Sequence, residues 1–144
     1  MPKRDIFHNS VKQALIKDGW NITHDPYTFT IGKKRLFADL GASRLISAEK
    51  GERKIAVEIK SFLGASDILD LEQTLGQYVL YRKLLEKQEP ARLLYVAINE
   101  DTFLDVFQSE IGDLLLADQT MPLIVFDPEN EVILQWIPNW NIAS

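Results

Sequence analysis

The hydrophobic and polar residues of this chain repeat with two different periods, and these periods predict where helices and strands lie. Apolar residues spaced three and four positions apart are typical of one helix face. This spacing predicts three helices, over residues 5–18, 66–88 and 100–117. Alternation, or a short apolar run, predicts strands over residues 27–31, 35–48, 53–60, 92–98, 123–126 and 132–136. The resulting order, α-β-β-β-α-β-α-β-β, indicates a mixed α/β domain.

Turn-forming residues separate these segments. Gly19 follows the first helix, and Pro90 prevents the second from continuing. Residues 49–52 are expected to form a hairpin loop, and residues 127–130 contain a proline suited to a turn between the last two strands. The Gly-Ala-Ser sequence at 41–43 indicates an irregularity or bulge within the strand over 35–48. No linker or repeat interrupts the pattern, so we expect a single domain over residues 1–144.

Two of these segments also indicate how their faces are used. Residues 92–98 are apolar on both faces, which is typical of a central strand covered by helices on both sides. The helix over 100–117 has one apolar face. We expect that face to point inward through Phe103, Val106, Phe107, Ile111, Leu114 and Leu115.

The strand over 53–60 has two chemically different faces. Ile55, Val57 and Ile59 alternate with Ala56, Glu58 and Lys60, and a strand sends alternate side chains to opposite faces. One face is therefore wholly apolar, whereas the other carries a carboxylate and an ammonium group two residues apart. The simplest alternative is that this charged face is only a solvated surface, as on many amphipathic strands.

Asp39 gives the charged face a chemical partner. It lies on the preceding strand, so Asp39 and Glu58 can place two carboxylates beside Lys60. Two neighbouring carboxylates repel each other unless a cation lies between them. A hard divalent ion, Mg²⁺ or Mn²⁺, suits these oxygen ligands, and Lys60 could then position an attacking water. The hypothesis is a metal-dependent phosphodiester hydrolase with Asp39, Glu58 and Lys60 as catalytic residues and the two acidic residues as metal ligands.

The predicted second helix offers candidate substrate-binding residues. Gln73, Gln77 and Tyr81 are spaced i, i+4, i+8 and share one helix face, where amide and phenol groups could donate to phosphate oxygens. The alternative is an ordinary polar face with Tyr81 half buried. Asp5 and His8 on the first helix could also approach the site, although a surface or helix-packing role is favoured for His8.

Composition and charge restrict the partners. The chain has a net charge of −5. It contains no cysteine, and this excludes disulfides and thiolate metal sites. Because nucleic-acid-binding proteins are usually basic, DNA contact would need a local patch such as Lys33-Lys34-Arg35. No apolar run is long enough to span a bilayer and no secretory signal is visible, so we expect a cytoplasmic protein without membrane association.

The tryptophans allow two interpretations. Trp136 and Trp140 lie in an apolar C-terminal segment that either forms an interface or closes the core of the sheet. Trp20 is expected to be a core residue.

The order Asp39 … Glu58-Ile59-Lys60, after a helix and before a helix and strand, resembles the PD-(D/E)XK nuclease superfamily, with Ala38 in place of the motif's proline. Residues 37–42, 48–52 and 55–62 resemble the XisH family in particular, and the similarity extends through residues 73–78 and the turn at 127–128. Gln77-x-x-x-Tyr81 is similar to an element that some of these nucleases place near metal and DNA. The resemblance implies a restriction-endonuclease-like α/β fold, with a mixed sheet flanked by helices and a C-terminal β-hairpin. It also implies a role in excision of the fdxN DNA element and association with an XisI-like partner.

Two hypotheses of different classes follow. The first is a Mg²⁺-dependent DNA endonuclease or nuclease-like controlling factor in programmed DNA element excision, acting on DNA with an XisI-like partner and, in one version, as a homo-oligomer. The second is a catalytically silent interaction module that regulates a site-specific recombinase through protein contacts, which the acidic charge balance favours. A toxin-antitoxin-like pair with XisI is a third possibility.

Overall fold

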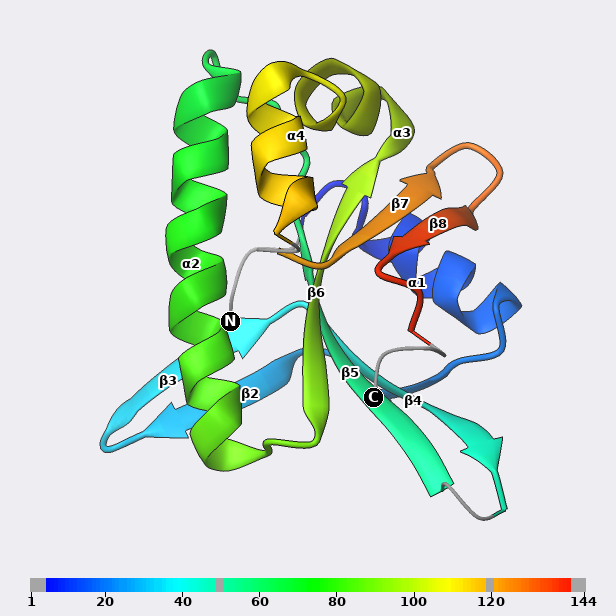
Figure 1. Cartoon of the computed structure of the whole chain (residues 1–144). Coiled ribbons are helices and arrows are strands. Elements are labelled where there is room, and N and C mark those ends of the chain that lie inside the picture. Colours follow the sequence, from blue (N-terminus) through cyan, green and yellow to red (C-terminus); the bar gives the residue numbers. More distant parts are fainter. Residues whose placement is uncertain (1–4, 49–50, 119–120, 141–144) are drawn as a thin grey trace.

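A six-stranded mixed sheet forms the centre of the molecule (Figure 1). The structure is a computed structural model and describes residues 5–48, 51–118 and 121–140. The strands of this sheet, in spatial order, are β1 (Asn21–His24), β4 (Leu40–Ser47), β5 (Gly51–Ile59), β6 (Arg92–Asn99), β7 (Leu123–Asp127) and β8 (Val132–Ile137). The central pairs β5–β6 and β6–β7 are parallel, and the outer pairs are antiparallel. The predicted mixed sheet, its buried central strand β6 and the C-terminal hairpin β7–β8 are thereby confirmed.

Helices cover both faces of the sheet. On one face α1 (His8–Lys17) contacts β1, β7 and β8. On the other face lies α2 (Asp67–Gln88), which contacts β6 and β2. The same face is also covered by a third helical segment, made of α3 (Glu100–Thr102), the π-helical turn η1 (Phe103–Phe107) and α4 (Glu110–Ala117). Each face has its own buried apolar cluster, so the sheet is the common wall of two cores. Among the described residues, no helix is long and apolar enough to cross a membrane.

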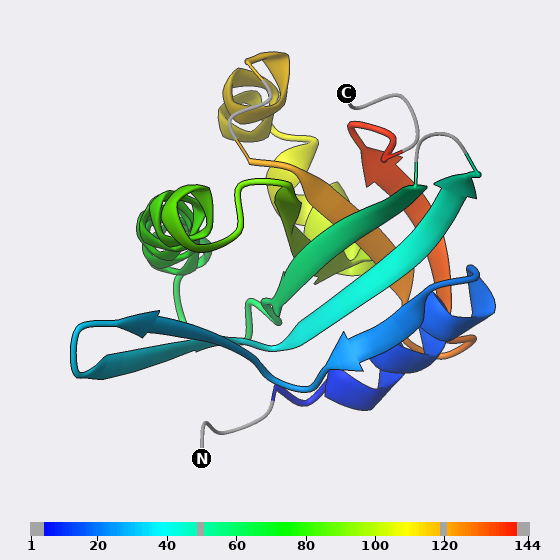
Figure 2. The same ribbon diagram turned by 90° about the horizontal axis from the view of Figure 1, so that it is seen from below.

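The expected strand over 35–48 is in fact two strands, β3 (Lys34–Ala38) and β4, which belong to different sheets. β2 (Tyr27–Ile31) and β3 form a separate two-stranded hairpin, which extends away from the main sheet (Figure 2). The chain leaves this hairpin at Asp39 and enters the main sheet as β4. The junction could not be read from alternation alone, because both strands alternate normally and only their partners differ.

The irregularity expected at residues 41–43 lies on the β1 side of this stretch, where Ile22 pairs with Ala42 and His24 with Gly41, leaving one extra residue on β1. Gly41, Ala42 and Ser43 pair in register with β5. Gly41 accommodates His24 of β1, whose Nδ1 would lie 2.9 Å from a Cβ added at this glycine. Further register shifts lie between Leu45 and Ser47 and between Val125 and Phe126. Residues 49 and 50 of the expected hairpin loop lie outside the described residues, and residues 51 and 52 belong to β5.

The predicted helix over 100–117 is interrupted before Ser109. Ser109 caps α4, because its Oγ accepts a hydrogen bond from the Gly112 N–H at 3.3 Å. Phe103, Val106 and Phe107 are buried as predicted and Leu115 is partly buried. Ile111 and Leu114, however, are 44% and 72% exposed. The prediction for those two residues is wrong because the interruption changes the phase of the helical repeat.

The N-terminal and C-terminal aromatic residues meet in one core. Trp20 is 2% exposed, and its ring lies 5.5 Å from that of Trp136 and 5.2 Å from that of Trp140. The core interpretation of the C-terminal tryptophans is therefore the one that the structure shows. Directly after Trp20 comes β1, a four-residue strand that the sequence pattern did not predict.

Candidate active site

β5 divides its side chains between the two cores of the molecule. Ile55, Val57 and Ile59 are buried in the cluster on the α1 side, as the alternation predicts. Ala56 faces the α2 side, and Glu58, two residues further, shares that face. Glu58 is only 7% exposed, so the interpretation of this face as a solvated surface does not hold for Glu58.

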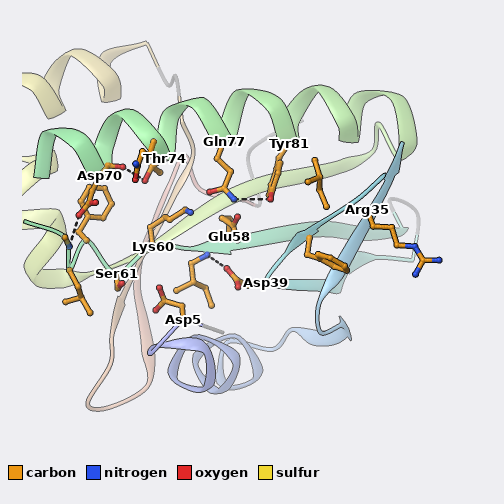
Figure 3. A pocket seen from close by; sticks show the side chains of 17 residues that line it. Asp5, Arg35, Asp39, Glu58, Lys60, Ser61, Asp70, Thr74, Gln77 and Tyr81 are labelled. Carbon is orange, nitrogen blue, oxygen red and sulfur yellow. Dashed lines mark hydrogen bonds between the residues drawn. The ribbon is translucent and has the colours of Figure 1, made fainter. Parts of the chain in front are cut away.

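Asp39 reaches Glu58 because of the change of sheet between β3 and β4. Its Oδ2 accepts a hydrogen bond from the Ile59 N–H at 2.7 Å, which fixes the carboxylate beside the end of β5 (Figure 3). Asp39 also lies close enough to Glu58 to raise the pKa of the Glu58 carboxyl. Asp39 and Glu58 are 19 residues apart in the sequence, and the pairing of β4 with β5 brings them together in space.

The surroundings of Glu58 favour its protonated form. Burial raises the pKa of Glu58 to about 10, and the hydrogen bond to Asp39 and the negative charge of Asp39 act in the same direction. The positive charge of Lys60 opposes this rise. A native protein at pH 7 therefore holds Glu58 in its neutral form.

Lys60 lies one residue beyond β5 and is half-buried. Its backbone N–H donates to the carbonyl of Ala97 at 3.0 Å, so the residue is held on the parallel ladder with β6. Its side chain lies in the space between β5 and α2, near Glu58 (Figure 3). The anchored backbone thus directs a flexible ammonium group into the same space as the two acids.

The predicted row on α2 lies on the opposite wall. Gln77 donates a hydrogen bond to the Tyr81 hydroxyl at 3.0 Å, and Tyr81 is 6% exposed. Burial raises the pKa of the Tyr81 phenol, and the nearby charges of Glu58 and Asp39 also raise it. Gln73, one turn before Gln77, is exposed at the other end of the row. Tyr81 is thus fully buried, whereas the alternative interpretation had it half buried.

A cavity of about 580 Å³ lies between these walls. All six predicted residues line it: Asp39, Glu58, Lys60, Gln73, Gln77 and Tyr81. The structure therefore brings together every residue of the predicted constellation. The roles assigned to these residues remain predictions.

Several other residues of the cavity wall were not predicted as site residues. Arg35 lines it, as do Asp70 and Thr74 at the far end. Arg35 could have been found from strand alternation, because it lies four positions before Asp39. Asp70 could have been found by extending the row of α2 one turn upstream, and its Oδ2 accepts a hydrogen bond from the Gly64 N–H at 3.0 Å.

His8 does not line this cavity. It is 3% exposed, and its Nε2 lies 2.7 Å from Oδ1 of Asp25. The helix-packing role favoured for His8 is confirmed, because this contact fastens α1 to the turn after β1. Of the two N-terminal candidates, only Asp5 lies in the cavity wall.

The pair of acids fits a hard divalent cation. Within the described residues, no group of three or more His, Cys, Asp or Glu side chains could form an all-protein metal cage. Mg²⁺ is commonly bound by one or two carboxylates, with water and substrate oxygens completing its shell. A cation between Asp39 and Glu58 would take the place of the proton that Glu58 carries. The acidic pair and the open cavity beside it therefore match this type of ligand set.

Two solved structures are similar to this chain over nearly its whole length. A crystal structure of an XisH family protein from Nostoc punctiforme PCC 73102 is 41% identical, with a TM-score of 0.81, and the match covers 92% of this chain and 99% of that one. A crystal structure of an fdxN element excision controlling factor protein from Anabaena variabilis is 43% identical, also with a TM-score of 0.81, covering 93% and 99%. No curated protein matches the chain. The XisH protein family model matches residues 1–134. The chain belongs to the XisH family.

Proposed function

We propose that this protein is a divalent-metal-dependent DNA phosphodiester hydrolase that acts in the excision of a DNA element. One observation carries the proposal: two acidic side chains, Asp39 and the buried Glu58, lie beside Lys60 in an open cavity. The biological setting comes from the Anabaena variabilis relative, which is named as an fdxN element excision controlling factor. The predicted restriction-endonuclease-like fold belongs to the same proposal.

The chain supplies each part of such a reaction. Asp39 and Glu58 would hold Mg²⁺ or Mn²⁺. The ion, when bound, supplies positive charge that stabilises the charge developing on the phosphorus centre and lowers the pKa of a coordinated water. Lys60 positions the attacking water and stabilises its deprotonated form. Gln77 and Tyr81, which line the opposite wall, would donate hydrogen bonds to phosphate oxygens.

The β2–β3 hairpin provides a local basic surface despite the net charge of −5. Residues 27–38 contain three basic residues, Lys33, Lys34 and Arg35, and no acidic residue. All three are exposed, and Arg35 also lines the cavity. A phosphate backbone bound along the hairpin would therefore lead into the space beside Asp39 and Lys60. Such binding should weaken as salt concentration rises, because counterions are released from the DNA.

A nicking assay tests the hydrolase. Purified protein, with and without an XisI-like partner, is incubated with supercoiled DNA carrying the element borders, in Mg²⁺, in Mn²⁺ or in EDTA. We expect metal-dependent nicking that Lys60→Ala abolishes while the urea unfolding midpoint stays unchanged. Lys54→Ala is the matched control, because Lys54 is an exposed lysine of β5 that lies outside the cavity. Wild-type protein that cuts no DNA under any of these conditions would contradict the proposal.

The acidic net charge and the name of the relative as a controlling factor also support a second function. In that case the protein is a catalytically silent module that regulates a recombinase through an XisI-like partner. An excision assay in cells separates the two functions. Asp39→Asn and Lys60→Ala should both stop excision if the protein hydrolyses DNA, and should both leave excision intact if it acts only through protein contacts.

A further inference from the structure

The outward face of α2 carries apolar side chains that the core does not use. The buried face of this helix is formed by Leu71, Thr74, Tyr78, Tyr81, Leu84 and Leu85. On the remaining surface, Leu69 is 53% exposed, Val79 is 42% exposed and Leu80 is 48% exposed. Because both faces are partly apolar, the helix has no single hydrophobic side, and its outward face needs a separate explanation.

The outward residues have the spacing of a helix-pairing seam. Leu69, Glu72, Gly76, Val79 and Lys83 follow one another at intervals of three, four, three and four. This is the repeat with which the a and d positions of a coiled coil face a partner helix. We propose that α2 pairs with α2 of a second copy of this chain, antiparallel about a two-fold axis.

Charge along the helix identifies the partner as a second copy. The first half of α2 carries Asp67, Asp70 and Glu72 with no basic residue, whereas the second half carries Arg82, Lys83 and Lys87 with one acid, Glu86. An antiparallel copy therefore places an acidic half against a basic half twice. Compensation of the helix dipole does not explain Glu72 and Lys83, because both lie beyond the terminal turns in which the dipole acts.

A single position of the two-fold axis gives several residues of the seam a suitable partner on the second copy. If Glu72 lies opposite Lys83 of the second copy, the axis passes between residues 77 and 78. The same axis sets Gly76 opposite Val79. A Cβ added at Gly76 would meet nothing within 4 Å, so the glycine leaves an open notch in the middle of the exposed face. Glycine in the middle of a helix costs roughly 1 kcal/mol relative to alanine, and a notch that receives Val79 of the second copy gives this cost a function.

Charge reversal tests this arrangement without disturbing the core, because Glu72 and Lys83 are exposed. The wild-type protein should be a dimer in sedimentation equilibrium. Glu72→Lys alone and Lys83→Glu alone should each raise the dimer dissociation constant roughly tenfold or more, because each variant places like charges opposite each other twice. An equimolar mixture of the two variants should recover the wild-type association, because every seam pair is then attractive.

The control is Glu52→Lys, which makes the same change at an exposed residue of β5 away from α2. It should leave the dimer intact. A wild-type protein that stays monomeric at 100 μM, or a dimer that Glu72→Lys does not weaken, overturns the proposal. So does a mixture of the two variants that fails to associate while both remain folded. An XisI-like partner that binds this face of a monomeric chain also overturns it. None of these measurements requires metal or DNA, so they are independent of the proposed hydrolase activity.

Discussion

Replacing Glu58 with glutamine tests whether that carboxyl group is held in its neutral form. Burial and the neighbouring Asp39 raise the pKa of Glu58 from 4.5 to about 10 in the native protein. In the unfolded chain the group has its ordinary pKa and is ionised at pH 7. Keeping it protonated in the native state at pH 7 therefore costs about 3 kcal/mol of folding free energy.

The direction of the pH effect follows from these two pKa values. Since the native pKa is the higher one, the native state binds more protons between about pH 4.5 and pH 10, and the stability of the wild type falls as the pH rises through that range. Glutamine has the same shape, remains neutral and can still donate to Asp39. We expect Glu58→Gln to be more stable than the wild type by up to about 3 kcal/mol at pH 7, with little difference at pH 4.

Urea denaturation at pH 4, 7 and 9 in EDTA measures this difference. Glu52→Gln, an exposed residue of the same strand, should follow the wild type at every pH. Addition of Mg²⁺ should then stabilise the wild type, more so at high pH because the ion replaces the proton, and should not stabilise Glu58→Gln. If the unfolding free energies of the wild type and Glu58→Gln change in parallel from pH 4 to pH 9, the raised pKa of Glu58 is refuted.

Three further substitutions test contacts that stabilise the fold around the site. For each variant, urea denaturation measures the loss of folding free energy. Trp20→Ala should cost about 3–5 kcal/mol, because it empties the centre of the tryptophan cluster. Ser66→Ala should cost about 1 kcal/mol, because Ser66 Oγ caps α2 by accepting from the Leu69 N–H at 3.2 Å. Arg92→Met should cost about 2 kcal/mol, because the buried guanidinium donates to the Ile55 carbonyl at 2.8 Å. Losses below about 0.5 kcal/mol would contradict the corresponding contact.

Local periodicity was sufficient for those parts of the site that lie on one element. The two faces of β5 and the Gln73-Gln77-Tyr81 row of α2 follow directly from strand alternation and helical spacing. The burial of Glu58 does not, because it depends on α2 covering that face of the sheet. A local pattern places a carboxylate on a face but contains no information about what covers it.

The errors in the predicted fold have the same origin. The break at Asp39 depends on which strands β3 and β4 pair with, and pairing is a property of distant segments. β1 is only four residues long, too short for its alternation to be distinguished from chance. The break before α4 did have a local signal, since Ser109 is followed by Glu110 and Asp113, but the continuous apolar pattern across it was stronger.

Asp39 lies at the junction of two sheets. The orientation of the β2–β3 hairpin therefore bears on the distance between the carboxyl groups of Asp39 and Glu58. The hairpin is fastened to the end of α2, where Gln88 donates to the Thr28 carbonyl at 3.0 Å and Tyr27 donates to Glu89 at 2.7 Å. Beyond these hydrogen bonds the basic tip of the hairpin extends away from the main sheet (Figure 2). Any rotation of the hairpin about its base changes the backbone direction at Asp39, and so the separation of its carboxylate from Glu58. If a polyanion binds at the tip, any effect it has on the hairpin would reach the two acids through the backbone of Asp39.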